Sequence, residues 1–222
     1  SYCNPIQYAE HRKTLENVIC TAGEFGATHV STFAGAWEGK PVESAYEEFG
    51  KVFRELADLA EEKGVKLGIE NCLMDGTWGH ATCNIGFNPK AWEVMFEEVK
   101  NDNFGLEWEP THQMVQLIDP VTELRKWCKK IVHIHGKDAT IDWDAVRHSG
   151  ISGAVPFVWH RMPGFGDTNW RDIISILRSN GYEDDICIEG YHDPVYSGEL
   201  EMTGQLHALN YLKWCRGGEF TP

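Results

Sequence analysis

The chain has 222 residues, of which 42% are hydrophobic and 12% aromatic, so it is long and apolar enough to close a sizeable globular core. Twenty basic and thirty-four acidic side chains give a formal net charge of −14, which disfavours nucleic acids and anionic membranes as partners. Composition therefore predicts a soluble globular protein with a small-molecule partner.

The seven cysteines are odd in number, scattered along the chain, and never spaced as C-x-x-C. This pattern indicates neither a disulfide framework nor a structural zinc site, and it favours a reducing, cytoplasmic location. No apolar run approaches the ~18 residues of a membrane helix.

Short β-branched or apolar runs alternate along the chain with longer amphipathic runs, which is typical of βα units that form a parallel sheet. Helical segments are predicted by the spacing of apolar residues, by the S-x-x-E capping box of Ser44 and Glu47, and by caps at Asn88, Asp119 and Thr168. The predicted strands span residues 28–35, 65–71, 104–110, 130–136 and 185–190.

Two long connections, residues 72–87 and 139–167, follow the carboxyl ends of predicted strands. Long loops at that end of parallel strands usually form binding elements, in open sheets and in barrels alike.

Four predicted strands end in a polar side chain: Glu70 in GIEN, Glu109 in EWEP, His135 in HIHG and Glu189 in CIEG. If the sheet closes, these side chains converge, and a cluster with a formal charge of about −3 repels itself unless a cation neutralises it. Three carboxylates and one imidazole suit Mn²⁺, Mg²⁺, Co²⁺ or Fe²⁺ better than a thiolate-type zinc site, although Zn²⁺ stays open. The neighbouring His133 shares a strand face with His135, and we expect it to fill an interior layer.

The ordered motifs GIEN, EWEPTH, HIHGKD, RMPGFGDTNWRDIISILRSNGY and ICIEG resemble the xylose isomerase-like TIM-barrel superfamily, in its sugar phosphate isomerase/epimerase branch, which is similar to D-tagatose 3-epimerase and inosose dehydratase. The resemblance covers roughly residues 28–214. It implies an α/β fold of the TIM (β/α)8 type in a single domain over residues 1–222, and one divalent metal ion, with Mn²⁺ favoured, held by the four strand-end residues. Glu109 stands where the family usually has Asp in a D-x-x-H motif, so its carboxylate is one methylene further from the backbone.

The resemblance makes the strand that ends at Glu70 the fifth of eight, so the first three strands are absent from these residues. We therefore expect the natural chain to extend further at its N-terminus, or a partner subunit or second copy to close the barrel. A complete five-stranded doubly wound sheet is the alternative.

The family chemistry is proton transfer next to a carbonyl through a metal-stabilised enediolate. Applied to this sequence, the resemblance implies that Glu70 and Glu189 are the catalytic bases of an isomerase or epimerase that acts on a keto sugar or related polyol. The resemblance also places His112, Lys137 and Arg161 near the substrate.

Aromatic side chains near the predicted mouth suit stacking on a sugar, and we expect Trp78, Trp108 and His192 to take part.

Other functions stay open. The same intermediate can expel water or an aglycone, which would make the protein a lyase or dehydratase. An abasic-site nuclease is disfavoured by the charge of −14. A sugar- or metal-binding barrel subunit without activity is a third alternative, and the glycines of RMPGFG offer a weak phosphate-binding signal.

Overall fold

The computed structural model describes residues 3–190 and 192–218. Two compact units share the chain: unit 1 comprises residues 1–108 with 130–133, and unit 2 comprises residues 109–129 with those from 134 onward. Within the described ranges, no helix is both long and apolar enough to cross a membrane.

Unit 1 contains the predicted parallel sheet. Strands β1 (His29–Thr32), β2 (Lys66–Glu70) and β3 (Phe104–Trp108) pair in parallel, and the first half of β4 (Ile131–Gly136) follows β3 in the strand order. In the β2–β3 register, Glu70 lies opposite Glu107. His133 is buried, as expected, and its ring stacks on His29 with centroids 3.9 Å apart.

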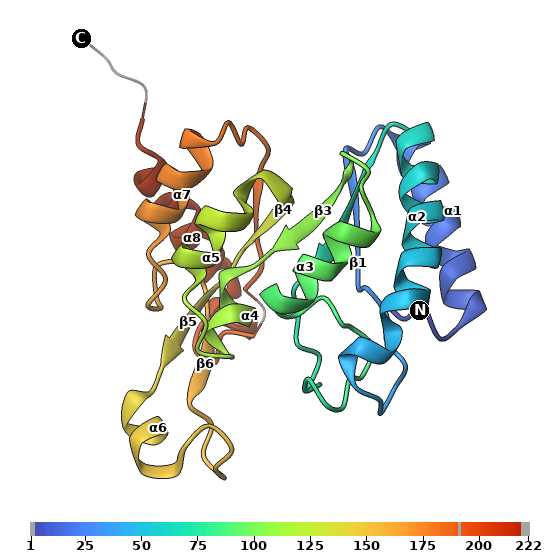
Figure 1. Cartoon of the computed structure of the whole chain (residues 1–222). Helices are drawn as coiled ribbons and strands as arrows, with labels where there is room; N and C mark the ends of the chain where they lie inside the picture. Colours follow the sequence, from blue (N-terminus) through green and yellow to red (C-terminus); the bar gives the residue numbers. More distant parts are fainter. Residues whose placement is uncertain (1–2, 191, 219–222) are drawn as a thin grey trace. The chain divides into compact units, whose positions relative to one another are not determined.

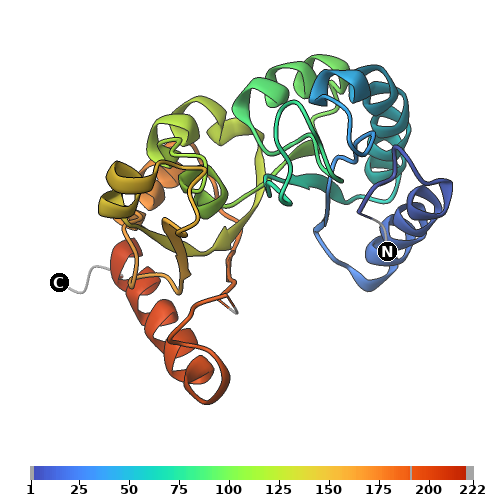
Figure 2. The same cartoon turned by 90° about the horizontal axis from the view of Figure 1, so that it is seen from below.

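Three helices lie side by side over the strands of unit 1 (Figures 1 and 2). They are α1 (Ala9–Phe25), α2 (Tyr46–Glu62) and α3 (Pro89–Glu98), and a short 3-10 helix, η1 (Val42–Ala45), precedes α2. Phe49 and Phe53 on α2 stack at 4.6 Å, and Phe53 packs 6.1 Å from Phe104 of β3. This aromatic cluster joins the helices to the sheet, because the apolar stripe of α2 faces β3.

The predicted caps are partly confirmed. Asn88 accepts a hydrogen bond from the backbone of Lys90, and Asp119 caps α5 (Pro120–Trp127). In α7 (Trp170–Ser179) the cap is Asn169 rather than Thr168. The Asn169 side chain accepts from the Asp172 amide, whereas the Thr168 hydroxyl donates to Met114 Sδ.

The capping box predicted at Ser44 is wrong. The chain already turns helically in η1, so the Ser44 hydroxyl donates to the Pro41 carbonyl at 2.6 Å, and α2 begins at Tyr46 without a side-chain cap.

Unit 2 is built around the second half of β4, which pairs in parallel with β7 (Ile186–Ile188), so that His135 lies opposite Cys187. Helix α7 packs against α5 and against α8 (Glu201–Arg216) (Figure 1). Unit 2 also contains the short helices α4 (Pro110–Met114) and η3 (Gly198–Leu200). The 3-10 helix η2 (Cys128–Lys130) leads into β4.

The long connection over residues 139–167 is not a plain loop. Strands β5 (Asp138–Ile141) and β6 (Val158–Arg161) form an antiparallel pair, and α6 (Trp143–Ser149) lies between them, at the yellow tip in Figure 1. Asp142 stabilises the start of α6 by accepting hydrogen bonds from the amides of Asp144 and Ala145.

The close approach of β3 to β4 inside unit 1 gives a stability prediction. A Cβ at Gly105 would lie 2.6 Å from Val132 Cγ1 and closer still to the Lys130 carbonyl oxygen. Gly105→Ala should therefore lower the free energy of unfolding by about 1–3 kcal/mol, as overpacking does. Urea unfolding measures this, and Gly79→Ala, where a Cβ meets nothing within 4 Å, is the matched control.

Candidate metal centre

Three of the four predicted ligands meet in unit 2. Glu109 directly precedes α4, His135 lies near the end of β4, and Glu189 follows β7. The Glu189 amide donates to the Gly136 carbonyl at 3.1 Å, which continues the β4–β7 pairing and sets Glu189 beside His135.

The donor atoms of these three residues converge. His135 Nδ1 lies 3.1 Å from Glu189 Oε2 and 3.8 Å from Glu109 Oε2. The Glu109 side chain is completely buried, while those of His135 and Glu189 are each 24% exposed. The site is thus partly exposed at His135 and Glu189.

Lys137 supplies the positive charge in this cluster. Its side chain is only 2% exposed, and Nζ lies 3.0 Å from Glu189 Oε1 and 3.6 Å from Glu109 Oε1. A buried carboxylate beside a partly buried one is stabilised by a cation that contacts both, which explains the burial of the Lys137 ammonium group. We expected Lys137 near the substrate, and its ammonium group forms ion pairs with the Glu109 and Glu189 carboxylates.

His112 completes the E-x-x-H motif. Pro110 starts α4 immediately after Glu109, so His112 falls one helical turn later, and its Nε2 lies 3.3 Å from Glu109 Oε1. The His112 side chain is 9% exposed, which places an imidazole against the buried carboxylate.

The charge state of Glu189 follows from these neighbours. Burial alone would raise its pKa, but the hydrogen bond with His135 and the charge of Lys137 outweigh burial and hold the pKa below its usual range. Glu189 is therefore an ionised carboxylate at neutral pH.

Arg161, at the end of β6, is held by Asp193. Arg161 Nε lies 3.1 Å from Asp193 Oδ2, and the guanidinium also lies over the Phe165 ring. Asp193 is 2% exposed and accepts further hydrogen bonds from the amides of Met162, Val195 and Tyr196. It ties the end of β6 to the segment that carries the exposed His192.

The glycine amides of RMPGFG donate hydrogen bonds to a carboxylate of the protein, rather than being left to bind a phosphate. The amides of Gly164, Gly166 and Thr168 donate to Asp138, at 3.1, 3.3 and 2.9 Å. Asp138 is fully buried, so this carboxylate organises the segment from within.

Sequence reasoning missed both Asp138 and Asp193. Their signals were an Asp beside the HIHGK motif and an Asp directly before Pro194, and both patterns are common in ordinary turns.

The remaining predicted site residues belong to unit 1. Glu70 ends β2 half-buried, and its carbonyl accepts from Asn84 Nδ2 at 2.9 Å. Trp78 is half-buried and hydrogen-bonds Glu43 through Nε1. Trp108 is completely buried, so its ring faces pack against protein and are not open to a sugar.

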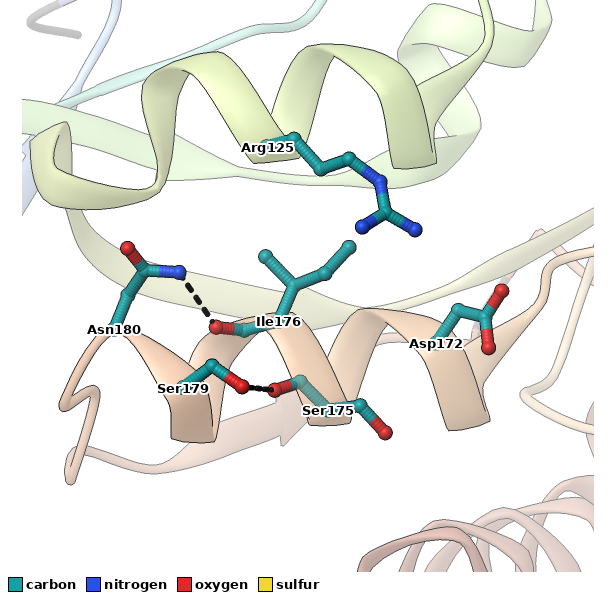
Figure 3. Close-up of a pocket in the computed structure, with 6 residues that line it drawn as sticks. All are labelled: Arg125, Asp172, Ser175, Ile176, Ser179 and Asn180. Atoms are coloured by element: carbon teal, nitrogen blue, oxygen red, sulfur yellow. Dashed lines mark hydrogen bonds between the residues drawn. The ribbon is translucent and has the colours of Figure 1, made fainter.

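A surface pocket on unit 2 lies between α5 and α7, and none of the predicted site residues lines it (Figure 3). The Ser179 hydroxyl and the Asn180 amide donate to the Ser175 and Ile176 carbonyls of α7. Both polar groups are therefore hydrogen-bonded within their own helix. Arg125 and Asp172 carry opposite charges, so the lining favours neither an anion nor a cation.

The donor set of unit 2 fits a divalent cation. Two carboxylates and one imidazole nitrogen face one another, and Glu189 Oε2 is shielded from solvent. Oxygen-rich ligation with one nitrogen is the set that Mn²⁺, Fe²⁺ and Zn²⁺ accept.

Two named enzymes resemble this chain in sequence. An inosose dehydratase of Clostridium tetani is 26% identical over 182 residues, which cover 80% of this chain and 57% of that protein. An inosose isomerase of Bacillus licheniformis is 27% identical over 153 residues, or 69% of this chain and 50% of that protein. The chain thus spans about half the length of the curated relatives it matches.

Solved structures share the fold. A xylose isomerase domain protein from Planctomyces limnophilus superposes with a TM-score of 0.70 at 20% identity, over 94% of this chain and 65% of that one. The IOLI protein, whose structure holds a zinc atom, superposes with a TM-score of 0.65 at 22% identity. The match covers 93% of this chain and 68% of that one.

A family model described as "Xylose isomerase-like TIM barrel" matches residues 4–213. The predicted family and α/β TIM-barrel fold class are thereby confirmed. The chain belongs to the xylose isomerase-like TIM barrel family.

Proposed function

We propose that this chain is a divalent-metal-dependent isomerase or epimerase that moves a proton next to the carbonyl of a keto sugar or related polyol. The observation that carries the proposal is the convergence of Glu109, His135, Lys137 and Glu189 within unit 2. The relatives named inosose isomerase and inosose dehydratase make inosose the first substrate to test.

Glu109, His135 and Glu189 are the proposed metal ligands in unit 2. Glu70 is the proposed fourth ligand, on the strength of its place at the carboxyl end of β2 and of the family resemblance. The cation, with Mn²⁺ first and Zn²⁺ next to be tried, supplies Lewis-acid polarisation of the substrate carbonyl when it is bound.

Glu189 is the proposed base. Its low pKa keeps the carboxylate ionised, and its partial exposure gives a substrate access to it. An ionised carboxylate can accept a proton from the carbon next to a carbonyl and return it. Glu70 would then act from the opposite face of the substrate, which is how two bases invert a carbon centre.

Dehydration is the second candidate. It shares the first proton removal and then needs an acid to protonate a departing hydroxyl. His112 beside Glu109 and the exposed His192 are the imidazoles proposed for that step. Relatives named inosose dehydratase favour this alternative.

Incubation with Mn²⁺ in deuterated water tests both candidates on inosose, D-fructose and D-tagatose. An isomerase or epimerase incorporates deuterium and keeps the substrate mass otherwise unchanged, whereas a dehydratase yields a product lighter by one water. Mass spectrometry distinguishes the two, and addition of EDTA should stop either reaction. If the protein binds metal but incorporates no deuterium into any of these sugars, both proposed activities are contradicted. The remaining alternative is then a metal- or sugar-binding protein without activity.

A further inference from the structure

His160 stands out among the histidines of unit 2. It lies on β6, where it pairs with Ala139 of β5. Side chains alternate along a strand, so the exposed Trp159 and the half-buried His160 face opposite sides.

Two other imidazoles lie around His160. Its ring centroid is 6.1 Å from that of His112 and 5.4 Å from that of His192, with both rings edge-on. His112 in turn contacts Glu109, so the three imidazoles form a connected row that leads to a proposed metal ligand.

The Nδ1 atom of His160 is shielded from solvent, and no hydrogen bond reaches it from residues 3–190 or 192–218. Buried polar atoms almost always have a partner, so such an atom indicates a partner beyond the described residues, and a bound ligand can supply it. Burial, followed by the charge of Lys137, lowers the pKa of His160 to about 4. The ring is therefore neutral at physiological pH and suits an uncharged hydroxyl.

Two sets of groups in unit 2 that could attract an anion are already engaged. Arg161 forms an ion pair with Asp193, and the amides of Gly164 and Gly166 donate hydrogen bonds to Asp138. A hydroxyl group is thus a better match for this side of unit 2 than a phosphate.

We propose that His160 is a substrate-contacting, specificity-determining residue that hydrogen-bonds a hydroxyl of the keto polyol, between His112 and His192. This inference rests on the proposed function and adds to it a residue that the E-x-x-H and strand-end motifs do not contain.

Two substitutions separate hydrogen bonding from packing. His160→Phe keeps a planar ring and removes the hydrogen bond, whereas His160→Asn keeps a polar group near the Nδ1 position. With Mn²⁺-loaded protein, we expect His160→Phe to raise the Kd of myo-inositol and the KM of inosose roughly tenfold, and His160→Asn to recover most of that loss. Metal content by mass spectrometry should stay unchanged in both.

His148→Phe, at an exposed histidine of α6, is the matched control and should leave both constants unchanged. Equal Kd and KM in the wild type and in a folded, metal-loaded His160→Phe variant would overturn this inference alone, and would assign His160 Nδ1 to an ordered water. If His160→Phe does not fold, an unchanged Kd and KM in His160→Asn and in His160→Ala would overturn it equally. A wild-type protein that binds Mn²⁺ but no polyol would overturn the proposed function, and this inference with it.

Discussion

Glu189→Gln should lower kcat for deuterium exchange into inosose by roughly 10²–10⁴, because general base catalysis typically contributes that much. Gln has nearly the same shape as Glu but cannot accept the proton. The substitution also removes one negative charge from the ligand set beside His135, so the affinity for Mn²⁺ should fall as well.

Steady-state kinetics and metal analysis by mass spectrometry measure these two effects separately. Glu183→Gln, at an exposed carboxylate just before β7, is the matched control and should change neither. Wild-type activity together with wild-type metal content in Glu189→Gln would contradict both roles assigned to this residue.

The strand-end residues could be predicted because parallel strands end at one edge. Short apolar runs fixed the ends of β3, β4 and β7 closely enough to single out Glu109, His135 and Glu189. Their convergence in unit 2 then follows from strand pairing and from the start of α4 at Pro110. Glu70 was found by the same reasoning, and its role as a ligand stays a prediction.

Other features have weak local signals. Helix α1 buries only Leu15 and Ile19 completely, so its apolar periodicity is sparse, and sequence reasoning did not identify it. The β5–β6 pair is joined through α6 rather than by a tight turn, so no hairpin motif marks it.

The charge pairing around the site also depended on tertiary contacts. Lys137 follows HIHG directly, which suggested a position near the substrate, and nothing local indicates that its ammonium meets Glu109 and Glu189. Asp138 similarly accepts from Gly164, and Asp193 from Arg161, each more than 25 residues away. Such long-range hydrogen bonds leave no periodic pattern in the sequence.

Lys137→Met should destabilise the metal-free protein by about 3 kcal/mol, because it leaves the buried Glu109 carboxylate and the partly buried Glu189 carboxylate without their cation. For a chain of this length, that corresponds to a loss of roughly 6–12 °C in Tm. The two carboxylates then become available to an added cation, so Mn²⁺ should raise the Tm of the variant more than that of the wild type.

Thermal unfolding in EDTA and in excess Mn²⁺ measures both effects. Lys51→Met removes an exposed ion pair with Glu47 and is the matched control. Exposed ion pairs contribute little to stability, so this substitution should leave the Tm almost unchanged. If the metal-free Lys137 variant is as stable as the wild type, the ammonium is not what neutralises the two carboxylates. If the variant is destabilised but Mn²⁺ restores nothing, Lys137 stabilises unit 2 while Glu109 and Glu189 are not metal ligands.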